Sequence, residues 1–503
     1  MNAAIPEYLQ PCLAEAILAA GCVVLLLFSR VRSFAHRAGD LALIVVAASV
    51  VGAVVSMDAP QGWLAGRMIV VDPFAAFFKF VMSTAALAVV WMSTRSRESI
   101  ANAAGAASGA GPVSWALFVA SLLGMDLMVS AAHVLAVWVG FEVVNVTSAL
   151  WIASRRDEAS ASGAALAALL EGAAASAMLL LGFALLYGLG GTLEYAALGD
   201  RLSHALAAPG GKAVMFAALT LVVAGLGYRL AIVPWHGSRV DLAEGAPLPV
   251  SAWFQVGSTI TGLAMLARLL HTALSDPAAD GQWVTLSGVE WPALLSVVAM
   301  VTMTVGNVAA LREANLKRLL AWLSVAQAGY LLTGLVVLND EGLRAMLFHG
   351  VAYALMTLGV LAAIAPVVEV AGTDDLEVLR GLARRRGGAR VVAVAVAVFL
   401  LSLAAVPPLA GHAGRVLLLT AVIKAGAPGL ALVATFNSAL GLLCCTRVVA
   451  TLLDRPHDAE ENVPLDFEVV VLVGLLVAGT VALGIWPAPL ASFVERSVVL
   501  FGG

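Results

Sequence analysis

Apolar segments follow one another along almost the whole chain, and only short polar connections separate them. A membrane-spanning helix needs about 20 mostly apolar residues. Segments of about this length, bounded by polar, proline or glycine residues, cover 13–29, 41–57, 73–94, 114–130, 132–153, 162–189, 213–233, 250–271, 292–311, 318–338, 343–366, 391–424, 428–453 and 468–490. The pattern predicts an all-α membrane protein with about fourteen transmembrane helices.

The composition agrees with a chain that lies mostly in the bilayer. Hydrophobic residues make up 61% of it and charged residues only 12%, whereas a soluble domain has roughly 25% charged residues. The net charge of −4 gives no basic field for nucleic acid. Glu7 precedes the first segment, which lacks the basic start and cleavage site of a signal peptide, so we expect a retained span.

The four cysteines lie in or beside apolar segments and do not have C-x-x-C spacing. They are Cys12, Cys22, Cys444 and Cys445. We interpret them as small apolar core residues, because this spacing favours neither a metal site nor a disulfide framework.

Basic residues gather in alternate connections. One set holds Arg30, Arg32, Arg37, Arg95, Arg97, Arg155, Arg156, Arg239, Arg312, Lys317, Arg318, Arg380, Arg384, Arg385, Arg386, Arg390 and Arg455, and the other holds little beyond Arg67, Arg201 and Lys212. Positive charge marks the cytoplasmic side, so both termini are expected on the periplasmic side. The connection 370–390 is interpreted as a cytoplasmic loop that sets the orientation of the chain. The alternative is that its arginines bind anionic lipid or a partner protein.

Charged residues inside the apolar segments are the candidate functional groups, since one at a helix centre costs about 2.5 to 3.5 kcal/mol. Glu142 lies near the middle of its segment, and Asn145 lies on the same face three residues later. We interpret Glu142 as a protonatable or ion-paired group on an ion path. The alternative is a structural carboxylate held by a neighbouring helix.

Two segments combine a helix-breaking proline with basic side chains. Arg229 precedes Pro234 and His236, and the double proline at 407–408 precedes His412 and Arg415. Proline frees backbone carbonyls that water or side chains must satisfy in a membrane. The sequence thus predicts discontinuous seventh and twelfth helices lining hydrated cavities, although Arg229 could instead extend to the membrane interface.

Broken helices at matching positions of two halves indicate internal repeats around a central ion site. We expect three N-terminal helices over 13–94, two inverted five-helix repeats over 114–271 and 292–453, and a C-terminal helix over 468–490, all in one transmembrane domain. Two further groups keep two interpretations each. Glu171 either continues a carboxylate path or interacts with a helix dipole, and His349 is either a proton carrier or a core histidine.

Two stretches, 227–250 and 306–330, resemble the antiporter-like membrane subunits of respiratory complex I. Within that family, the motif that begins Glu244-Gly-Ala-Pro, the run from Asp375 to Arg380, and Asn437-Ser with Arg447 resemble subunit N, the counterpart of mitochondrial ND2. The resemblance covers roughly residues 110 to 450.

This resemblance implies a central axis of charged residues that carries protons. The fifth-helix glutamate of the family matches Glu142, and the lysine positions of the seventh and twelfth helices match Arg229 and Arg415. The eighth-helix lysine is replaced by Thr259. Arginine does not release its proton in proteins, so protons would have to travel by water and by the two histidines that follow the prolines, His236 and His412. Gln327 of the tenth helix is placed on the same path.

The expected function is therefore that of a proton-translocating, subunit-N-like component of a bacterial inner-membrane NADH-quinone oxidoreductase. The resemblance implies no cofactor in this chain, with NADH, FMN, iron–sulfur clusters and quinone in partner subunits. The expected partners are other membrane subunits and the lipid bilayer. The alternatives are a non-pumping structural subunit, or a cation/proton antiporter or membrane hydrogenase subunit of the same superfamily.

Overall fold

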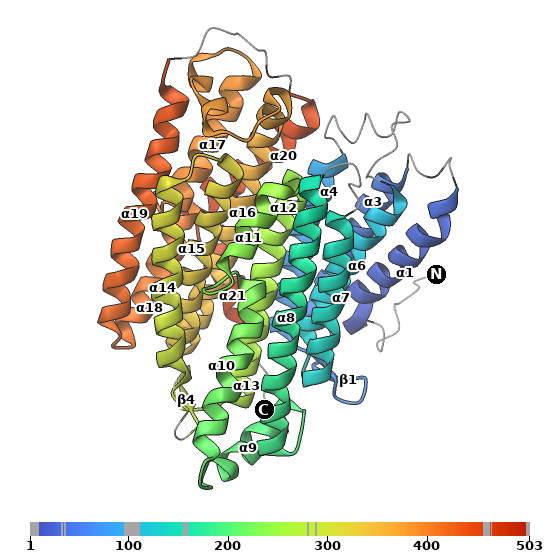
Figure 1. The fold of residues 1–503 in the computed structure, drawn as a ribbon, viewed down its shortest axis with the longest axis vertical. Helices are drawn as coiled ribbons and strands as arrows, with labels where there is room; N and C mark the ends of the chain where they lie inside the picture. Colours follow the sequence, from blue (N-terminus) through green and yellow to red (C-terminus); the bar gives the residue numbers. More distant parts are fainter. Residues whose placement is uncertain are drawn as a thin grey trace.

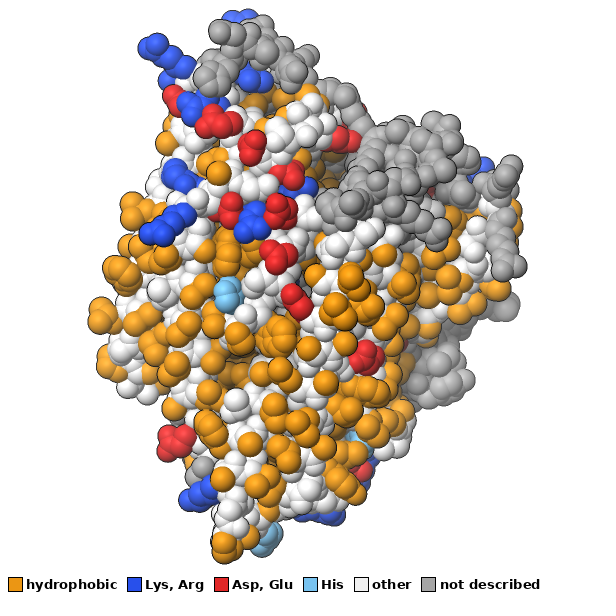
Figure 2. All heavy atoms as spheres, in the orientation of Figure 1, with side chains coloured by type: hydrophobic (Ala, Val, Ile, Leu, Met, Phe, Trp, Pro, Cys, Tyr) orange, Lys and Arg blue, Asp and Glu red, His pale blue; other side chains and the backbone are white. Residues whose placement is uncertain are grey.

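The computed structural model describes residues 10–31, 34, 37–94, 111–153, 159–278, 281–286, 289–455, 463 and 465–498. Long helices run side by side along the longest axis of the molecule, with α1 and α3 at one edge and α19 at the opposite edge (Figure 1). A wide band of hydrophobic side chains covers the visible face, and charged side chains gather toward its two ends (Figure 2). This surface suits a protein that spans a bilayer.

Thirteen helical segments in the described part of the chain are long and apolar enough to cross a membrane. Besides the seventh, eighth and last spans, ten of them are formed by one α-helix each: α1 (Leu13–Leu27), α3 (Ala38–Met57), α4 (Pro73–Thr94), α6 (Pro112–Ser130), α7 (Val134–Ile152), α8 (Ala159–Gly190), α14 (Trp291–Arg312), α15 (Leu316–Val336), α16 (Asp340–Ala371) and α19 (Pro428–Leu453). α20 (Phe467–Ile485) is the last span. These boundaries confirm the expected spans to within a few residues.

The seventh and twelfth spans are discontinuous, as the prolines predict. The seventh consists of α10 (Gly211–Leu230) and α11 (His236–Gly245), and the twelfth of α17 (Gly388–Leu403) and α18 (Ala410–Lys424). α17 and α18 have 16 and 15 residues, so neither is long enough to cross alone. The pair that would add a fourteenth span is 376–384 together with α17, and the two segments are bent by 111° against each other. The expected range 213–233 corresponds to α10 alone, and the expected range 391–424 contains both α17 and α18.

The eighth span lies at the centre of the molecule. It consists of α12 (Leu248–Trp253), one π-helical turn over Phe254–Ser258, and α13 (Thr259–Ala273). Every residue from 250 to 271 in this span is buried. A π turn shifts the backbone hydrogen bonds by one residue and is frequent at functional sites, so the middle of the eighth span is a candidate functional region.

Several short elements were absent from the expected pattern. Two antiparallel hairpins, β1–β2 (Gly62–Leu64 and Ile69–Val71) and β3–β4 (Ser275–Pro277 and Trp283–Thr285), and the helices α9 (Tyr195–Leu206) and α21 (Ala488–Ser497) lie in connections or after the last span. The expected span 468–490 was too long, because Trp486 and Pro487 end α20 and start α21. Short elements of this kind carry no long apolar run.

Arg239 was misplaced by the sequence pattern. It was assigned to a connection, but it lies in α11 and only 5% of it is exposed. In the connection 370–390, by contrast, Arg380 pairs with Glu377 and Asp454 at the surface, and Arg384 donates to the Leu453 carbonyl at the end of α19. Arg32, Arg95, Arg97, Arg155 and Arg156 lie outside the described residues, as does Glu7.

The close approach of α8 and α10 gives a test of the fold. A Cβ atom on Gly225 of α10 would lie 2.7 Å from the Ala175 carbonyl oxygen of α8. We expect Gly225→Leu to push the helices apart and to destabilise the protein by about 1–3 kcal/mol. The measurement is the loss of the monodisperse size-exclusion peak after heating in detergent. Gly188→Leu on α8, where nothing lies within 4 Å of the added Cβ, should leave the midpoint unchanged.

Candidate functional site

Arg229 lies in the last turn of α10, deep in the protein and 2% exposed. Its Nη2 donates to the Phe141 carbonyl at 2.9 Å and to Asn145 Oδ1 at 3.0 Å, both on α7. The guanidinium also lies 4.5 Å above the Phe141 ring. Gly172 of α8 makes room for this contact, since a Cβ there would lie 2.3 Å from Asn145 Oδ1. A buried cation is thus held by neutral acceptors and an aromatic face.

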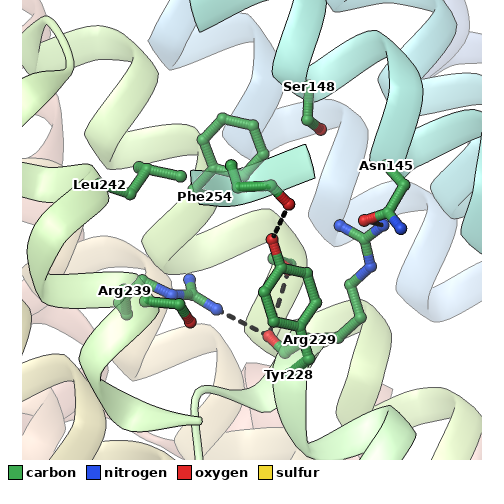
Figure 3. Close-up of a pocket in the computed structure, with 10 residues that line it drawn as sticks. Asn145, Ser148, Tyr228, Arg229, Arg239, Leu242 and Phe254 are labelled. Carbon is green, nitrogen blue, oxygen red and sulfur yellow. Dashed lines mark hydrogen bonds between the residues drawn. The ribbon is translucent and has the colours of Figure 1, made fainter. Parts of the chain in front are cut away.

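Arg239 closes the break that follows α10. Its Nη2 donates to the Arg229 carbonyl at 2.7 Å, and Ser258 Oγ of the π turn donates to the same oxygen at 3.1 Å. Both bonds are drawn in Figure 3. This carbonyl lies in the last turn of α10, where no following turn of helix supplies N–H donors. A guanidinium from the second half-helix therefore satisfies a backbone acceptor of the first.

A small polar cavity lies beside these two arginines (Figure 3). It measures about 20 Å³, and its lining includes Asn145, Tyr228, Arg229, Arg239 and Ser258. One water molecule needs roughly 10–15 Å³ measured in this way, so the cavity holds about one. The Tyr228 hydroxyl donates to the Ala168 carbonyl of α8 at 2.9 Å on its wall. The seventh-helix break therefore borders a polar space, as the sequence predicts.

Glu142 of α7 lies at the interface with α8 and is partly exposed. Its carboxylate accepts a short hydrogen bond from Ser176 of α8, whose hydroxyl in turn accepts from Trp138 Nε1 at 3.0 Å. Glu142 and Arg229 therefore have different hydrogen-bond partners, although Arg229 binds residues just before and one turn after Glu142. The two groups interact electrostatically, without a direct hydrogen bond.

The middle of the protein holds a hydroxyl group at the π turn. Tyr353 of α16 donates to the Gln255 carbonyl at 2.5 Å, and Ser324 of α15 lies 2.5 Å from the same hydroxyl. Thr259, the residue at the family's lysine position, lies beside Tyr353 and is 1% exposed. The centre of the eighth span is thus polar and uncharged.

The break in the twelfth span is bridged in a similar way. Gln327 of α15 donates to the Leu403 carbonyl at the end of α17 (3.1 Å), and its Oε1 accepts from His349 Nε2 (3.0 Å) and from Arg415 Nη2 (3.2 Å). Arg415 also donates to the Leu403 carbonyl at 3.2 Å and lies 3.9 Å above the Tyr330 ring. His349 lies one helical turn before Tyr353 on α16, so this group adjoins the central hydroxyl.

The two breaks share one device. In each, an arginine of the second half-helix donates to a carbonyl near the end of the first: Arg239 to Arg229 in the seventh span and Arg415 to Leu403 in the twelfth. Ala231 and Ala405 occupy the left-handed region, with φ of 55° and 60°, directly after or near the ends of α10 and α17. By position, the counterpart of Arg415 is therefore Arg239 and not Arg229.

The buried polar side chains that lie between the two helix breaks are called the polar chain. Four of its members were expected as site residues: Arg229, Thr259, Gln327 and Arg415. His236 and His412 lie beside it. The His236 ring contacts Trp322 at 5.6 Å between centroids, and His412 Nδ1 lies 3.1 Å from the Ala405 carbonyl. Glu171 is half-buried and interacts with Ser238 of α11.

Three members of the polar chain were not predicted as site residues: Arg239, Ser324 and Tyr353. Of these, only Arg239 carried a usable signal, because it lies three residues after His236 and would share its face if the helix resumed after Pro234. His349, whose role the sequence left open, belongs to the polar chain through its hydrogen bond to Gln327.

A bundle of spanning helices, broken twice at its centre and joined there by buried polar groups, defines the class: a polytopic membrane protein built like the antiporter-like subunits. The family model described as NADH:quinone oxidoreductase/Mrp antiporter matches residues 131–441. NADH-quinone oxidoreductase subunit N of Anaeromyxobacter sp. is 35% identical over 94% of this chain and 92% of that protein. The chain belongs to this family of antiporter-like membrane subunits, and it is most similar to subunit N.

Solved structures show the same fold. A chain of respiratory complex I from Thermus thermophilus matches with a TM-score of 0.77 and 26% identity, over 95% of this chain and 98% of that one. A chain of an archaeal membrane-bound sulfane sulfur reductase matches with a TM-score of 0.83 and 20% identity, over 98% and 97%. The second likeness is one of fold alone.

The role of Arg239 at the break can be tested by substitution. We expect Arg239→Met to leave the Arg229 carbonyl with Ser258 as its remaining donor and to destabilise the protein by about 1.5–3 kcal/mol, the value of a hydrogen bond to a charged group. The measurement is the thermal midpoint of the purified protein in detergent. Lys212→Met, at an exposed position near the start of α10, is the control, and an equal midpoint for both variants would contradict the assignment.

Proposed function

We propose that this chain is a proton-translocating membrane subunit of a complex-I-type NADH-quinone oxidoreductase in a bacterial inner membrane. Electron transfer takes place in partner subunits, and neighbouring membrane subunits contact this chain within the bilayer. The names of its relatives support this assembly. The observation that carries the proton-transfer role is a pair of buried polar groups, one at each helix break, whose members Tyr353 and His349 lie one turn apart on α16.

Within this chain the arginines act as fixed cations. Arginine stays protonated, so Arg229, Arg239 and Arg415 do not relay protons but set the electrostatic potential of the path. Protons move instead through groups that can release them. These are the His349 imidazole and the Tyr353 hydroxyl, together with water in the cavity beside Arg229.

Glu142 acts at the edge of the path. It lies partly exposed at the α7–α8 interface, where a neighbouring subunit can change its charge state. A change at Glu142 alters the α7 segment that holds Arg229 through the Phe141 carbonyl and Asn145. We infer that Glu142 gates the first half of the path in this way, with Thr259 as its uncharged midpoint and Arg415 as the cation of the second half.

We also propose that residues 114–271 and 292–453 are two inverted repeats and that both termini face the periplasm. Three features support the repeats: the paired breaks, the left-handed alanine near each, and the amide that accepts from an arginine in each half, Asn145 in one and Gln327 in the other. The basic connections support the orientation. His236 and His412, each beside a break, are then placed to exchange protons with the aqueous phases.

A non-pumping structural subunit is the second candidate. One observation favours it: no lysine contributes to the described polar chain between Arg229 and Arg415, whereas the resemblance implies lysines there. The names of the relatives favour subunit N over an antiporter or hydrogenase subunit. The two candidates make opposite predictions for substitutions that leave the fold intact.

The first of these substitutions removes the charge at the edge of the path. In the complete oxidoreductase reconstituted into vesicles, we expect Glu142→Gln to lower the number of protons moved per NADH oxidised, because the amide cannot change its charge. The acidification of the vesicle interior and NADH oxidation are measured together. Glu290→Gln, at an exposed residue before α14, is the control. A normal ratio in Glu142→Gln would favour the structural candidate.

The second substitution removes the central hydroxyl. We expect Tyr353→Phe to slow proton transport several-fold while the complex still assembles, because the ring keeps its volume but loses the group that bonds Gln255 and Ser324. Tyr187→Phe, at a tyrosine that is 51% exposed on α8, is the matched control. Equal transport rates in the two variants would exclude Tyr353 from the path.

A further inference from the structure

A second charged cluster lies among the N-terminal helices, outside the polar chain described above. Lys79 of α4 forms an ion pair of 2.5 Å with Glu15 in the first turn of α1, and the two residues are only 2% and 8% exposed. Asp126 of α6 interacts electrostatically with both. Each of the three residues belongs to a different span, and none of them was expected from the sequence to be a functional group.

Asp126 is the unusual member of the cluster. It has no exposed surface, and neither of its carboxyl oxygens has a hydrogen-bond partner among the described residues. An ionised carboxylate without partners in an apolar interior costs several kcal/mol or more, and such a group becomes neutral instead. The Lys79 ammonium is already paired with Glu15.

The charge balance of the cluster leads to the same result. One cation and two carboxylates carry a net charge of −1 if all three are ionised, and like charges close together disfavour double ionisation. One added proton makes the cluster neutral. Either carboxylate can hold that proton while the other pairs with Lys79.

We propose that Glu15, Lys79 and Asp126 form a proton-binding site that holds one exchangeable proton between its two carboxylates. The proton leaves one oxygen of Asp126 and binds to Glu15, and Lys79 then pairs with the ionised Asp126 and keeps its own charge. Glu15 is the outer end of the site, because it lies in the first turn of α1 and is the more exposed carboxylate. Release to water takes place from Glu15.

The surroundings limit which other groups can share the proton. On the outer side, Cys12 precedes α1 and interacts with Glu15 and Lys79. On the inner side, Arg268 of α13 donates to the Val129 carbonyl at 3.0 Å and forms a buried pair with Asp72 at 2.7 Å. α3 contributes Ser49, which bonds Ser83 one turn after Lys79. Asp72 accepts two hydrogen bonds from Arg268, so it is engaged by its own partner and is not a member of the cluster.

Infrared spectroscopy of the whole protein in lipid bilayers tests the proposal. A protonated carboxyl group has a carbonyl-stretch band at a higher frequency than the bands of ionised carboxylates and amides, and exchange into D₂O shifts this band. At neutral pH we expect such a band in the wild type, its loss in Asp126→Asn, and its persistence in Asp58→Asn, a change at an exposed aspartate.

A second variant leaves Asp126 in place. In Glu15→Gln, Asp126 becomes the partner of Lys79 and ionises, so we expect the band to disappear here too. Lys79→Met removes the cation, and we expect the band to double because both carboxylates then hold protons. The same band in the wild type and in Glu15→Gln would overturn the proposal, even if Asp126→Asn fails to fold. The readout requires no quinone turnover, so it stands apart from the proposed function.

Discussion

The backbone carbonyls freed at the two helix breaks are the constraint on which the interior depends. Inside a bilayer no bulk water can satisfy them, so the protein must supply donors. It does so with arginines of the second half-helices: Arg239 of α11 donates to the carbonyl of Arg229 in α10, and Arg415 of α18 donates to the carbonyl of Leu403 in α17. Each break therefore brings a permanent cation to the middle of the membrane, and nearby amides and aromatic rings are arranged around it.

This device separates two tasks that a buried lysine would combine. A guanidinium stabilises a break and fixes a positive potential, but it cannot pass on a proton. In the proposed function, proton transfer then depends on neutral groups between the breaks, and the structure places Tyr353 and His349 one turn apart on α16. The N-terminal cluster keeps a lysine, Lys79, but holds it in an ion pair.

Much of the fold could be predicted from the sequence, because burial in a bilayer demands long apolar runs and each break demands a proline. The spans, the two discontinuous helices and the family follow from these patterns. The energetic cost of a membrane-buried charge also singled out Glu142, Arg229 and Arg415 as candidates, and the structure buries Arg229 and Arg415 at the two breaks. The boundaries at Pro487 and at the seventh and twelfth spans were less accurate, since apolar residues continue past the point where the helix ends.

The sequence by itself determined how deep each residue lies along its helix, where the breaks fall and which class of protein the chain forms. Only the tertiary structure decided which side chains meet. It moved Arg239 from a connection into a buried break, joined His349 to Gln327, and brought Glu15, Lys79 and Asp126 together from three spans. The physical reason is that hydropathy reports depth, whereas contacts between spans depend on how each helix is rotated and which helices are its neighbours.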